Sequence, residues 1–206
     1  MVLLALFGAV MGQGVIWYTG QFYAMFFLEK TLLVDGATTN ILIAIALGLG
    51  TPFFIFFGWL SDKIGRLKII LAGCLIAALT YFPLFGALTH YVNPALEAYA
   101  AATPISVAAA PADCNFHMFI GPWSKFTDCD KAKDFLTKQG LSFKSTPSVA
   151  GETLVVKIGD QELKGAWDVT KAEAALKTTG YPGPADKNKV NYGMTLLILF
   201  IMLIYV

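Results

Sequence analysis

Long apolar runs separated by short polar segments make up residues 1–90 of the chain. Residues 2–28, 38–59 and 69–88 contain no charged side chain. A helix needs about 20 residues to cross the roughly 30 Å of hydrocarbon in a bilayer. The pattern therefore predicts three transmembrane helices over these ranges.

A fourth apolar run, residues 192–206, continues to the last residue of the sequence. About 13 residues follow Gly193, which is fewer than a full membrane crossing requires. We interpret this run as the start of a fourth transmembrane helix, truncated at its C-terminal end. We also expect the sequence to be a fragment that is cut near Met1, where it opens directly into a helix.

The segment between these regions, residues 91–191, holds most of the 15 Lys and Arg residues and most of the 14 acids. Its first part, residues 91–112, is rich in Ala and Pro and is interpreted as a linker. A compact α+β module is expected to follow. Its predicted strands are residues 113–120, 141–144, 153–158 and 161–164, the last two joined by a turn at Gly159-Asp160.

Two helices are predicted in the same module. Residues 128–139 form the first, and Gly140 ends it. Thr170 and Glu173 have the spacing of a capping box, which predicts a second helix that stops at Gly180. These patterns leave the order of the strands open.

The composition supports a membrane protein. Of the 206 residues, 56% are apolar and 14% are charged, and the mean hydropathy is +0.63, which is typical of a polytopic chain. The net charge is only +1 and no basic run is present, so no nucleic-acid partner is expected. Ser61 stands beside Asp62 without a nearby His, and no phosphate loop stands out, so we do not expect an enzyme.

The charges between the second and third apolar runs predict the orientation of the chain. Residues 60–68 carry Lys63, Arg66 and another basic residue against the single Asp62. Short loops rich in Lys and Arg stay in the cytoplasm. Residues 60–68 are therefore expected inside a bacterial plasma membrane, and residues 91–191 are expected to be periplasmic or extracellular.

The cysteines of the insert follow from this orientation. Cys114 and Cys129 both lie in the module that is expected outside, where disulfides persist. A bridge that closes a loop of about 15 residues would stabilise the module by roughly 3 kcal/mol. The alternative is a pair of free thiols. His117 has no neighbours at metal-site spacing, so no metal is expected.

Polar side chains recur on one face of the first predicted helix. Gln13, Trp17 and Gln21 are spaced four residues apart, and Tyr18 lies beside them. One interpretation is that the glutamines join neighbouring helices and the aromatic rings serve packing. The other is that the four side chains line a substrate path, because buried amides at mid-membrane depth mark functional sites.

The turn between the second and third runs resembles a known motif. Its residues Gly58, Leu60, Ser61, Asp62, Gly65 and Arg66 match G-x-L-[SA]-D-x-x-G-R. This pattern resembles the cytoplasmic loop motif of the major facilitator superfamily of secondary transporters. Leu67 departs from the fuller pattern, which is often basic there. Residues 12–28 also look like helix 7 of the metabolite:proton symporter branch.

The resemblance implies a role for the motif in gating. Gly58 and Gly65 would let backbones turn sharply or pass closely, and Arg66 would pair with Asp62 or another acid to lock the cytoplasmic face in one state. The alternative is a topological anchor that uses positive charge alone. That alternative explains the basic residues but not an acid between two glycines.

The prediction is an all-α polytopic membrane protein, part of a 12-helix major-facilitator bundle, with a small α+β extracytoplasmic insert. The chain would correspond to helices 7 to 10, and the missing N-terminal half of the same transporter would be a partner, besides membrane lipid. The implied function is proton-coupled symport of a small metabolite, an organic acid or a compatible solute, by alternating access without a cofactor. The competing hypothesis is a membrane-anchored sensor or binding protein that uses the outer module.

Overall fold

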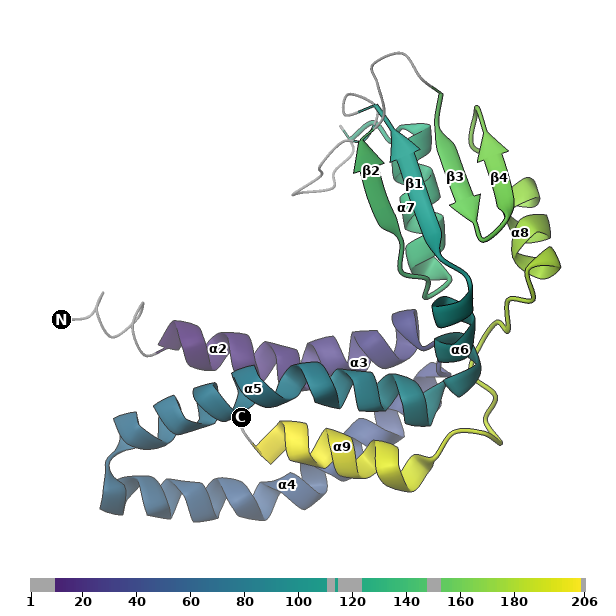
Figure 1. The fold of residues 1–206 in the computed structure, drawn as a ribbon. Helices are drawn as coiled ribbons and strands as arrows, with labels where there is room; N and C mark the ends of the chain where they lie inside the picture. The colour runs from purple at the N-terminus through teal and green to yellow at the C-terminus, as the bar shows by residue number, and fades with distance from the viewer. Residues whose placement is uncertain (1–9, 111–113, 115–123, 148–152, 205–206) are drawn as a thin grey trace. The chain divides into compact units, whose positions relative to one another are not determined.

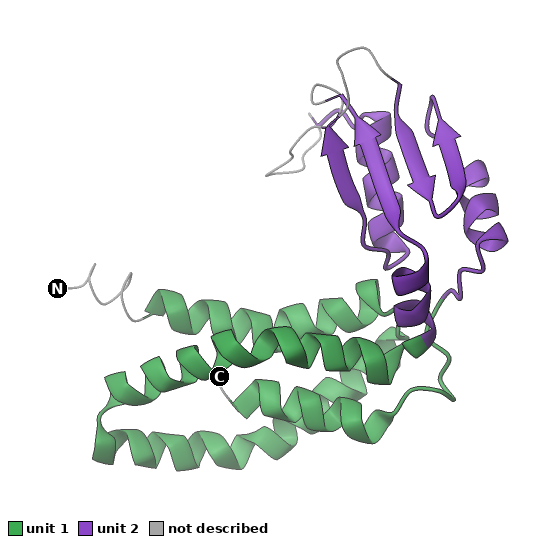
Figure 2. Cartoon of the chain, viewed as in Figure 1, with its two compact units in different colours: residues 1–94, 184–206 green, residues 95–183 purple. Residues whose placement is uncertain are grey.

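The computed structural model describes residues 10–110, 114, 124–147 and 153–204 (Figure 1). The chain forms two compact units (Figure 2). Unit 1 consists of Met1–Pro94 with Pro184–Val206, and unit 2 consists of Ala95–Gly183. Unit 1 is helical, whereas unit 2 combines helices with a four-stranded sheet.

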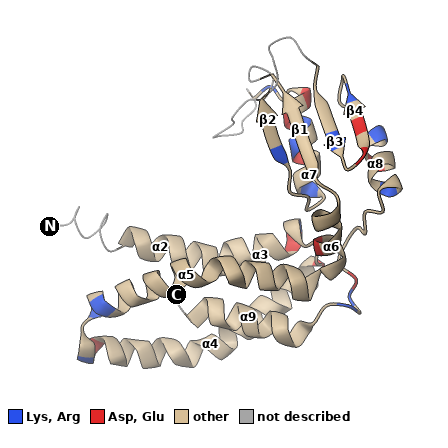
Figure 3. Ribbon diagram, viewed as in Figure 1, with Lys and Arg blue, Asp and Glu red and all other residues tan. Residues whose placement is uncertain are grey.

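Two long apolar helices dominate unit 1. They are α4 (Gly36–Ile64) and α5 (Arg66–Val92), and both are long and apolar enough to cross a membrane by length and composition. Both helices include a proline, Pro52 in α4 and Pro83 in α5. The Lys and Arg residues of this pair lie where the two helices meet (Figure 3).

The loop predicted at residues 60–68 is wrong, because α4 continues through Leu60 to Ile64 and α5 starts at Arg66. Gly65 alone separates the two helices, with φ +103°. Residues 60–64 contain no glycine or proline that would end a helix, so the helical hydrogen bonding continues until Gly65 leaves the right-handed region.

The first helix of unit 1 is not a uniform α-helix. It comprises α2 (Met11–Tyr18), a π-helical segment η2 (Thr19–Tyr23), α3 (Ala24–Phe26) and a second π-helical segment η3 (Phe27–Thr31). It runs past residue 28, the end predicted from hydropathy. Residues 2–9 of the predicted helix lie outside the described residues.

The core of unit 1 gathers around α9 (Tyr192–Ile204), which packs against both α4 and α5. The fully buried side chains come from all of these helices and from the end of the first one. They include Leu28, Leu32, Leu88, Leu199, Met202 and Leu203.

Short contacts join the loop after the first helix to the segments that flank unit 2. Asn93 donates from Nδ2 to the Leu32 carbonyl at 3.2 Å. The Ala185 amide donates to the Leu33 carbonyl at 3.3 Å, and the Asn191 amide donates to the Tyr91 carbonyl at 2.9 Å. These contacts hold the chain on either side of unit 2 to the same end of the helical unit.

The sheet of unit 2 has the order β2-β1-β3-β4. The central strand β1 (Ile105–Ala109) runs parallel to β2 (Lys144–Pro147) and antiparallel to β3 (Val155–Ile158). The fourth strand, β4 (Gln161–Lys164), forms a hairpin with β3. The hairpin predicted around Gly159-Asp160 is therefore confirmed.

Three helices accompany this sheet: α6 (Pro94–Ala102), α7 (Asp128–Lys138) and α8 (Val169–Thr178). The helix α7 links the parallel strands β1 and β2, and the helix predicted over residues 128–139 is confirmed. The buried core unites the sheet with these helices. It includes Val107, Ala132, Leu136, Val156, Ile158 and Leu176.

Several predictions for the insert need correction. The linker predicted at residues 91–112 contains α6 and β1, because its Ala-rich first part is a good helix former and residues 105–109 alternate buried and half-buried positions. The strand predicted at 141–144 begins only at Lys144. Almost all of the strand predicted at 113–120 lies outside the described residues.

Candidate functional site

Gln13 and Trp17 lie beside each other at one shallow hollow of the helical unit. The hollow has a volume of about 310 Å³ and is also lined by Val10, Gly14 and Ile70 of α5. Gln13 is half-buried, whereas 38% of Trp17 is exposed. An amide next to an indole face offers one hydrogen-bonding group and one apolar wall.

Tyr18 points to a second hollow on the same helix and belongs to an aromatic cluster with Trp17 and Phe22. The ring centroids are 5.3 Å apart for Trp17 and Tyr18, 5.4 Å for Trp17 and Phe22, and 5.3 Å for Tyr18 and Phe22. The second hollow, of about 370 Å³, is lined by Tyr18, Thr19, Phe22, Tyr23 and Phe26. Phe22 was missed from the sequence, although its spacing four residues after Tyr18 would have shown it.

Gln21 lines neither hollow. It lies inside η2 (Thr19–Tyr23), where i→i+5 hydrogen bonding replaces the i→i+4 pattern. A π-helical turn shifts the residues in and after it away from the face that regular spacing predicts. The structure therefore brings Gln13, Trp17 and Tyr18 to neighbouring positions but leaves Gln21 apart from the hollows.

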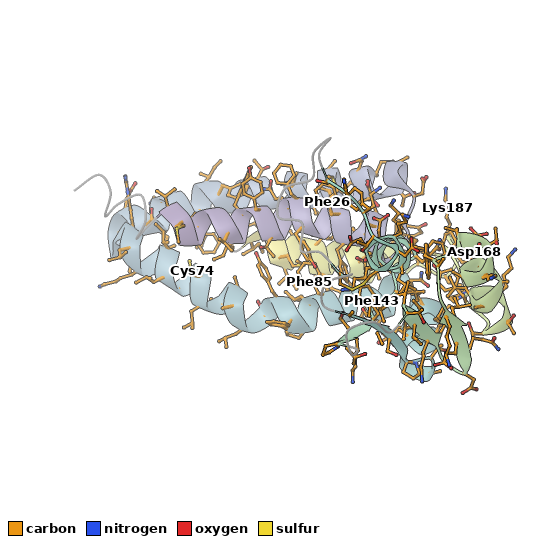
Figure 4. All side chains as sticks on the ribbon, turned by 90° about the horizontal axis from the view of Figure 1, so that it is seen from above. Phe26, Cys74, Phe85, Phe143, Asp168 and Lys187 are labelled. Atoms are coloured by element: carbon orange, nitrogen blue, oxygen red, sulfur yellow. A yellow bond between two sulfur atoms is a disulfide. The ribbon has the colours of Figure 1, made fainter. Side chains whose placement is uncertain are left out.

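Neighbouring side chains of α5 hold this part of the first helix. Tyr81 donates its hydroxyl to the Ile16 carbonyl at 3.1 Å. Phe85 packs edge-on against Tyr23 and Phe27, with centroid distances of 5.3 and 5.0 Å. Figure 4 labels Phe85 and Cys74 along α5. No local pattern singled out Tyr81, because its hydroxyl bonds a residue that lies 65 positions away in the chain.

The turn motif is exposed in this structure. Asp62 and Arg66 form an ion pair at 3.2 Å, with 67% and 80% of their side chains exposed. Ser61 donates its hydroxyl to the Gly58 carbonyl at 2.7 Å. A Cβ at Gly58 or Gly65 would meet no described atom within 4 Å. The motif therefore shows the sharp turn at Gly65 but no close backbone approach at Gly58.

The insert carries the two remaining candidate residues. Cys114 and Cys129 are joined by a disulfide, with their Cα atoms 5.3 Å apart. Cys129 lies in the first turn of α7 and is 1% exposed. Cys74 of α5 is a free thiol. Among the described residues, no three His, Cys, Asp or Glu side chains converge as a set of metal ligands.

The shifted pKa values of Asp128, Asp168 and Tyr181 in the insert have local causes. A hydrogen bond from the Lys131 ammonium and one from the Trp167 amide lower the pKa of Asp128. The Thr170 hydroxyl and amide lower the pKa of Asp168. Burial raises the pKa of Tyr181 to about 12, and its hydroxyl donates to the Gln139 carbonyl at 2.6 Å. Hydrogen bonds within the fold therefore account for the two lowered carboxyl pKa values, and burial accounts for the raised pKa of Tyr181.

Comparison with known proteins found one partial likeness. The chain is 37% identical over 71 residues to a protein of Staphylococcus haemolyticus named "Putative proline/betaine transporter". The match covers 34% of this chain and 15% of the relative, so the chain spans only a small part of the relative's length. No family model and no solved structure matches the chain. The likeness, together with two helices that could span a membrane, supports a membrane transporter.

Proposed function

We propose that the chain is part of a secondary active transporter of the major facilitator superfamily, in its metabolite:proton symporter branch. The observation that carries this proposal is the partial likeness to a relative named as a proline/betaine transporter. The helical hairpin of α4 and α5 supports it, because the residues at and before Gly65 are those of the family's loop motif. Transport would proceed by proton-coupled alternating access.

The proposed substrate is a zwitterionic compatible solute of the proline or betaine type. A quaternary or secondary ammonium is attracted to the faces of aromatic rings, and Trp17, Tyr18 and Phe22 form an exposed group of three such rings. Gln13 next to Trp17 would donate a hydrogen bond to the carboxylate of the solute. These side chains would form the part of the binding site that this chain supplies.

The proposed gate is the exposed turn of α4 and α5. Asp62 and Arg66 pair across Gly65, with the acid in the last turn of one helix and the base at the start of the next. An exposed pair of this kind contributes little to stability, so it can exchange partners at small cost when the cytoplasmic face closes or opens. The turn would lie in the cytoplasm and unit 2 outside a bacterial plasma membrane.

Uptake of labelled betaine into cells that produce the whole transporter to which this chain is proposed to belong tests the proposal. We expect saturable uptake that Asp62→Asn reduces at least about tenfold, because the neutral amide cannot form the charge-assisted bonds of the gate. The amount of the variant in the membrane should be unchanged. The matched control is Asp160→Asn, the same chemical change in a hairpin turn of unit 2.

Two outcomes contradict this proposal. The absence of saturable betaine and proline uptake, with the protein present in the membrane, would reject transport of this substrate class. Full activity of the Asp62→Asn variant would reject the gate while leaving transport intact.

A further inference from the structure

We propose that the Cys114–Cys129 disulfide of unit 2 is a thiol–disulfide exchange site for a dithiol of a protein or peptide. A thiolate of the partner would attack Cys114, and Cys129 would leave as the thiolate. This activity belongs to unit 2, goes beyond the transport proposed for unit 1 and does not rest on it.

The two sulfur atoms differ in access. Cys129 is 1% exposed and belongs to the core of unit 2 with Ala132 and Leu136. Cys114 is partly exposed and packs against the edge of that core. In exchange the thiolate attacks the accessible sulfur, and the other sulfur departs. The structure therefore assigns the roles of target and leaving group to different cysteines.

The position of Cys129 makes it a competent leaving group. It is the second residue of α7 (Asp128–Lys138), within the turn whose amides have no intrahelical acceptor. A helix N-terminus favours the thiolate and so speeds its departure, and this effect must outweigh the opposing effect of burial in apolar surroundings.

Two carboxylates next to Cys129 oppose this effect, but both are engaged. Asp128 accepts hydrogen bonds from the Lys131 ammonium at 3.0 Å and the Trp167 amide at 3.3 Å. Asp130 accepts one from the Thr127 amide at 3.0 Å. Their charge is therefore partly compensated by hydrogen-bond donors that would remain after the disulfide opens.

A hollow lies beside the Cys129 end of the disulfide. One wall is the start of α7 from Thr127 to Cys129, and the other is formed by Thr153, Leu154 and the residues at Gly165. Its volume is about 310 Å³. A Cβ at Gly165 would meet no described atom within 4 Å, so this wall is open. When the partner is an extended peptide, the residues next to its attacking cysteine would lie in this hollow.

The exchange balances without a further reagent. A bond forms between the partner's sulfur and the Cys114 sulfur, the disulfide breaks, and its electron pair stays on the Cys129 sulfur. The second thiolate of the partner then attacks its own sulfur in the mixed disulfide and expels the Cys114 thiolate. The partner dithiol loses two electrons and two protons, and the disulfide of unit 2 gains them.

The test uses the whole protein in membranes, with Cys74→Ala to remove the free thiol and glutathione as the probe. After quenching with acid, mass spectrometry locates the mixed disulfide. We expect the glutathione adduct on Cys114 at least about tenfold more often than on Cys129, because attack follows access. Equal adducts on both cysteines would mean that reduction follows unfolding, and this result would overturn the proposal.

A pair of charge variants on α7 gives an independent readout. Asp128→Asn removes a negative charge next to Cys129 in the sequence and should speed the reaction with glutathione several-fold, with the adduct still on Cys114. Asp134→Asn is the matched control, because Asp134 lies later on the same helix in an exposed pair with Lys138. Equal rates for both variants, or a bridge that glutathione leaves intact while it reduces an exposed reference disulfide, would reject the exchange site.

Discussion

A single glycine decides where the two long helices of unit 1 meet. Gly65 has φ +103° and ψ 128°, a conformation that side chains with a Cβ rarely adopt. The motif was recognisable from the sequence, and so was the spacing that pairs Asp62 with Arg66. The length of the turn was not, because residues 60–64 are polar enough for a loop but contain no glycine or proline that would end a helix.

The strain at this glycine can be measured with a matched pair of variants. Gly65→Ala should cost about 1–3 kcal/mol, because the new Cβ meets the backbone in this conformation. Gly58→Ala should be neutral or stabilise by up to about 1 kcal/mol, since Gly58 is helical and its surroundings are open. Thermal unfolding of the protein in detergent checks both values. A stable Gly65→Ala variant would show that the turn can relax.

The two glutamines of the first helix provide a second residue-scale prediction. Gln13→Ala should raise the KM for betaine roughly three- to tenfold, the loss expected for one hydrogen bond. Gln21→Ala should leave KM unchanged, because Gln21 lines neither hollow. Uptake kinetics at several concentrations measure both. An unchanged KM for Gln13→Ala would make this residue a packing residue.

Irregular elements were harder to predict than regular ones. The apolar runs predicted α4 and α5 because hydrophobicity persists over the whole length of each helix. They did not predict η2, since hydrophobicity does not distinguish a π-helical turn from an α-helical one. They also missed β1, whose five residues lie in an Ala-rich stretch and become a strand through pairing on both sides.

The start of α8 shows how local signals compete. The capping box predicted at Thr170 and Glu173 is wrong, because the N-cap is Asp168, two residues before Thr170, and the helix begins at Val169. The Asp168 carboxylate accepts from the Thr170 amide at 2.9 Å and from its hydroxyl at 2.6 Å. Asp and Thr are both good N-caps, so the sequence alone did not decide between them.

This cap predicts an acid dependence of unit 2. The pKa of Asp168 is lowered in the folded state, so its stabilising effect is present above the ordinary carboxyl pKa and is lost as the pH falls through the folded value. Asp168→Asn should keep most of the cap and remove this part of the pH dependence, whereas Asp168→Ala should lower the melting temperature at neutral pH. Circular dichroism between about pH 2 and about pH 7 measures both effects, because this range includes the ordinary carboxyl pKa values. The same acid slope in the wild type and Asp168→Asn would contradict the assignment.

At the scale of the whole molecule, charge and hydropathy change sharply between the apolar helices and the polar insert, and the two compact units divide near these changes. The order of the strands in the sheet did not follow from the sequence. The neighbouring strands β1 and β2 are connected through α7, and pairing over such a distance leaves no local pattern. Likewise, the packing of α9 against both α4 and α5 depends on tertiary contacts rather than on periodicity.

The proposed orientation can be tested on intact cells. An amine reagent that cannot cross the membrane should modify lysines of unit 2, such as Lys131 and Lys138, and spare Lys63 and Lys68 until the cells are opened. All four lysines are exposed in the structure, so without a membrane barrier all four would react. Labelling of Lys63 with protection of unit 2 would invert the topology and remove the transporter proposal.

The contacts around Tyr91 and Asn191 have an evolutionary consequence. The Asn191 amide donates a hydrogen bond to the Tyr91 carbonyl at 2.9 Å. The chain therefore leaves the helices and returns to them at neighbouring points. A segment attached in this way behaves as a cassette, which can be gained, lost or replaced by a short bridge without pulling α5 and α9 apart. Relatives of this chain are therefore expected to differ by the presence of this domain while keeping the same helical scaffold.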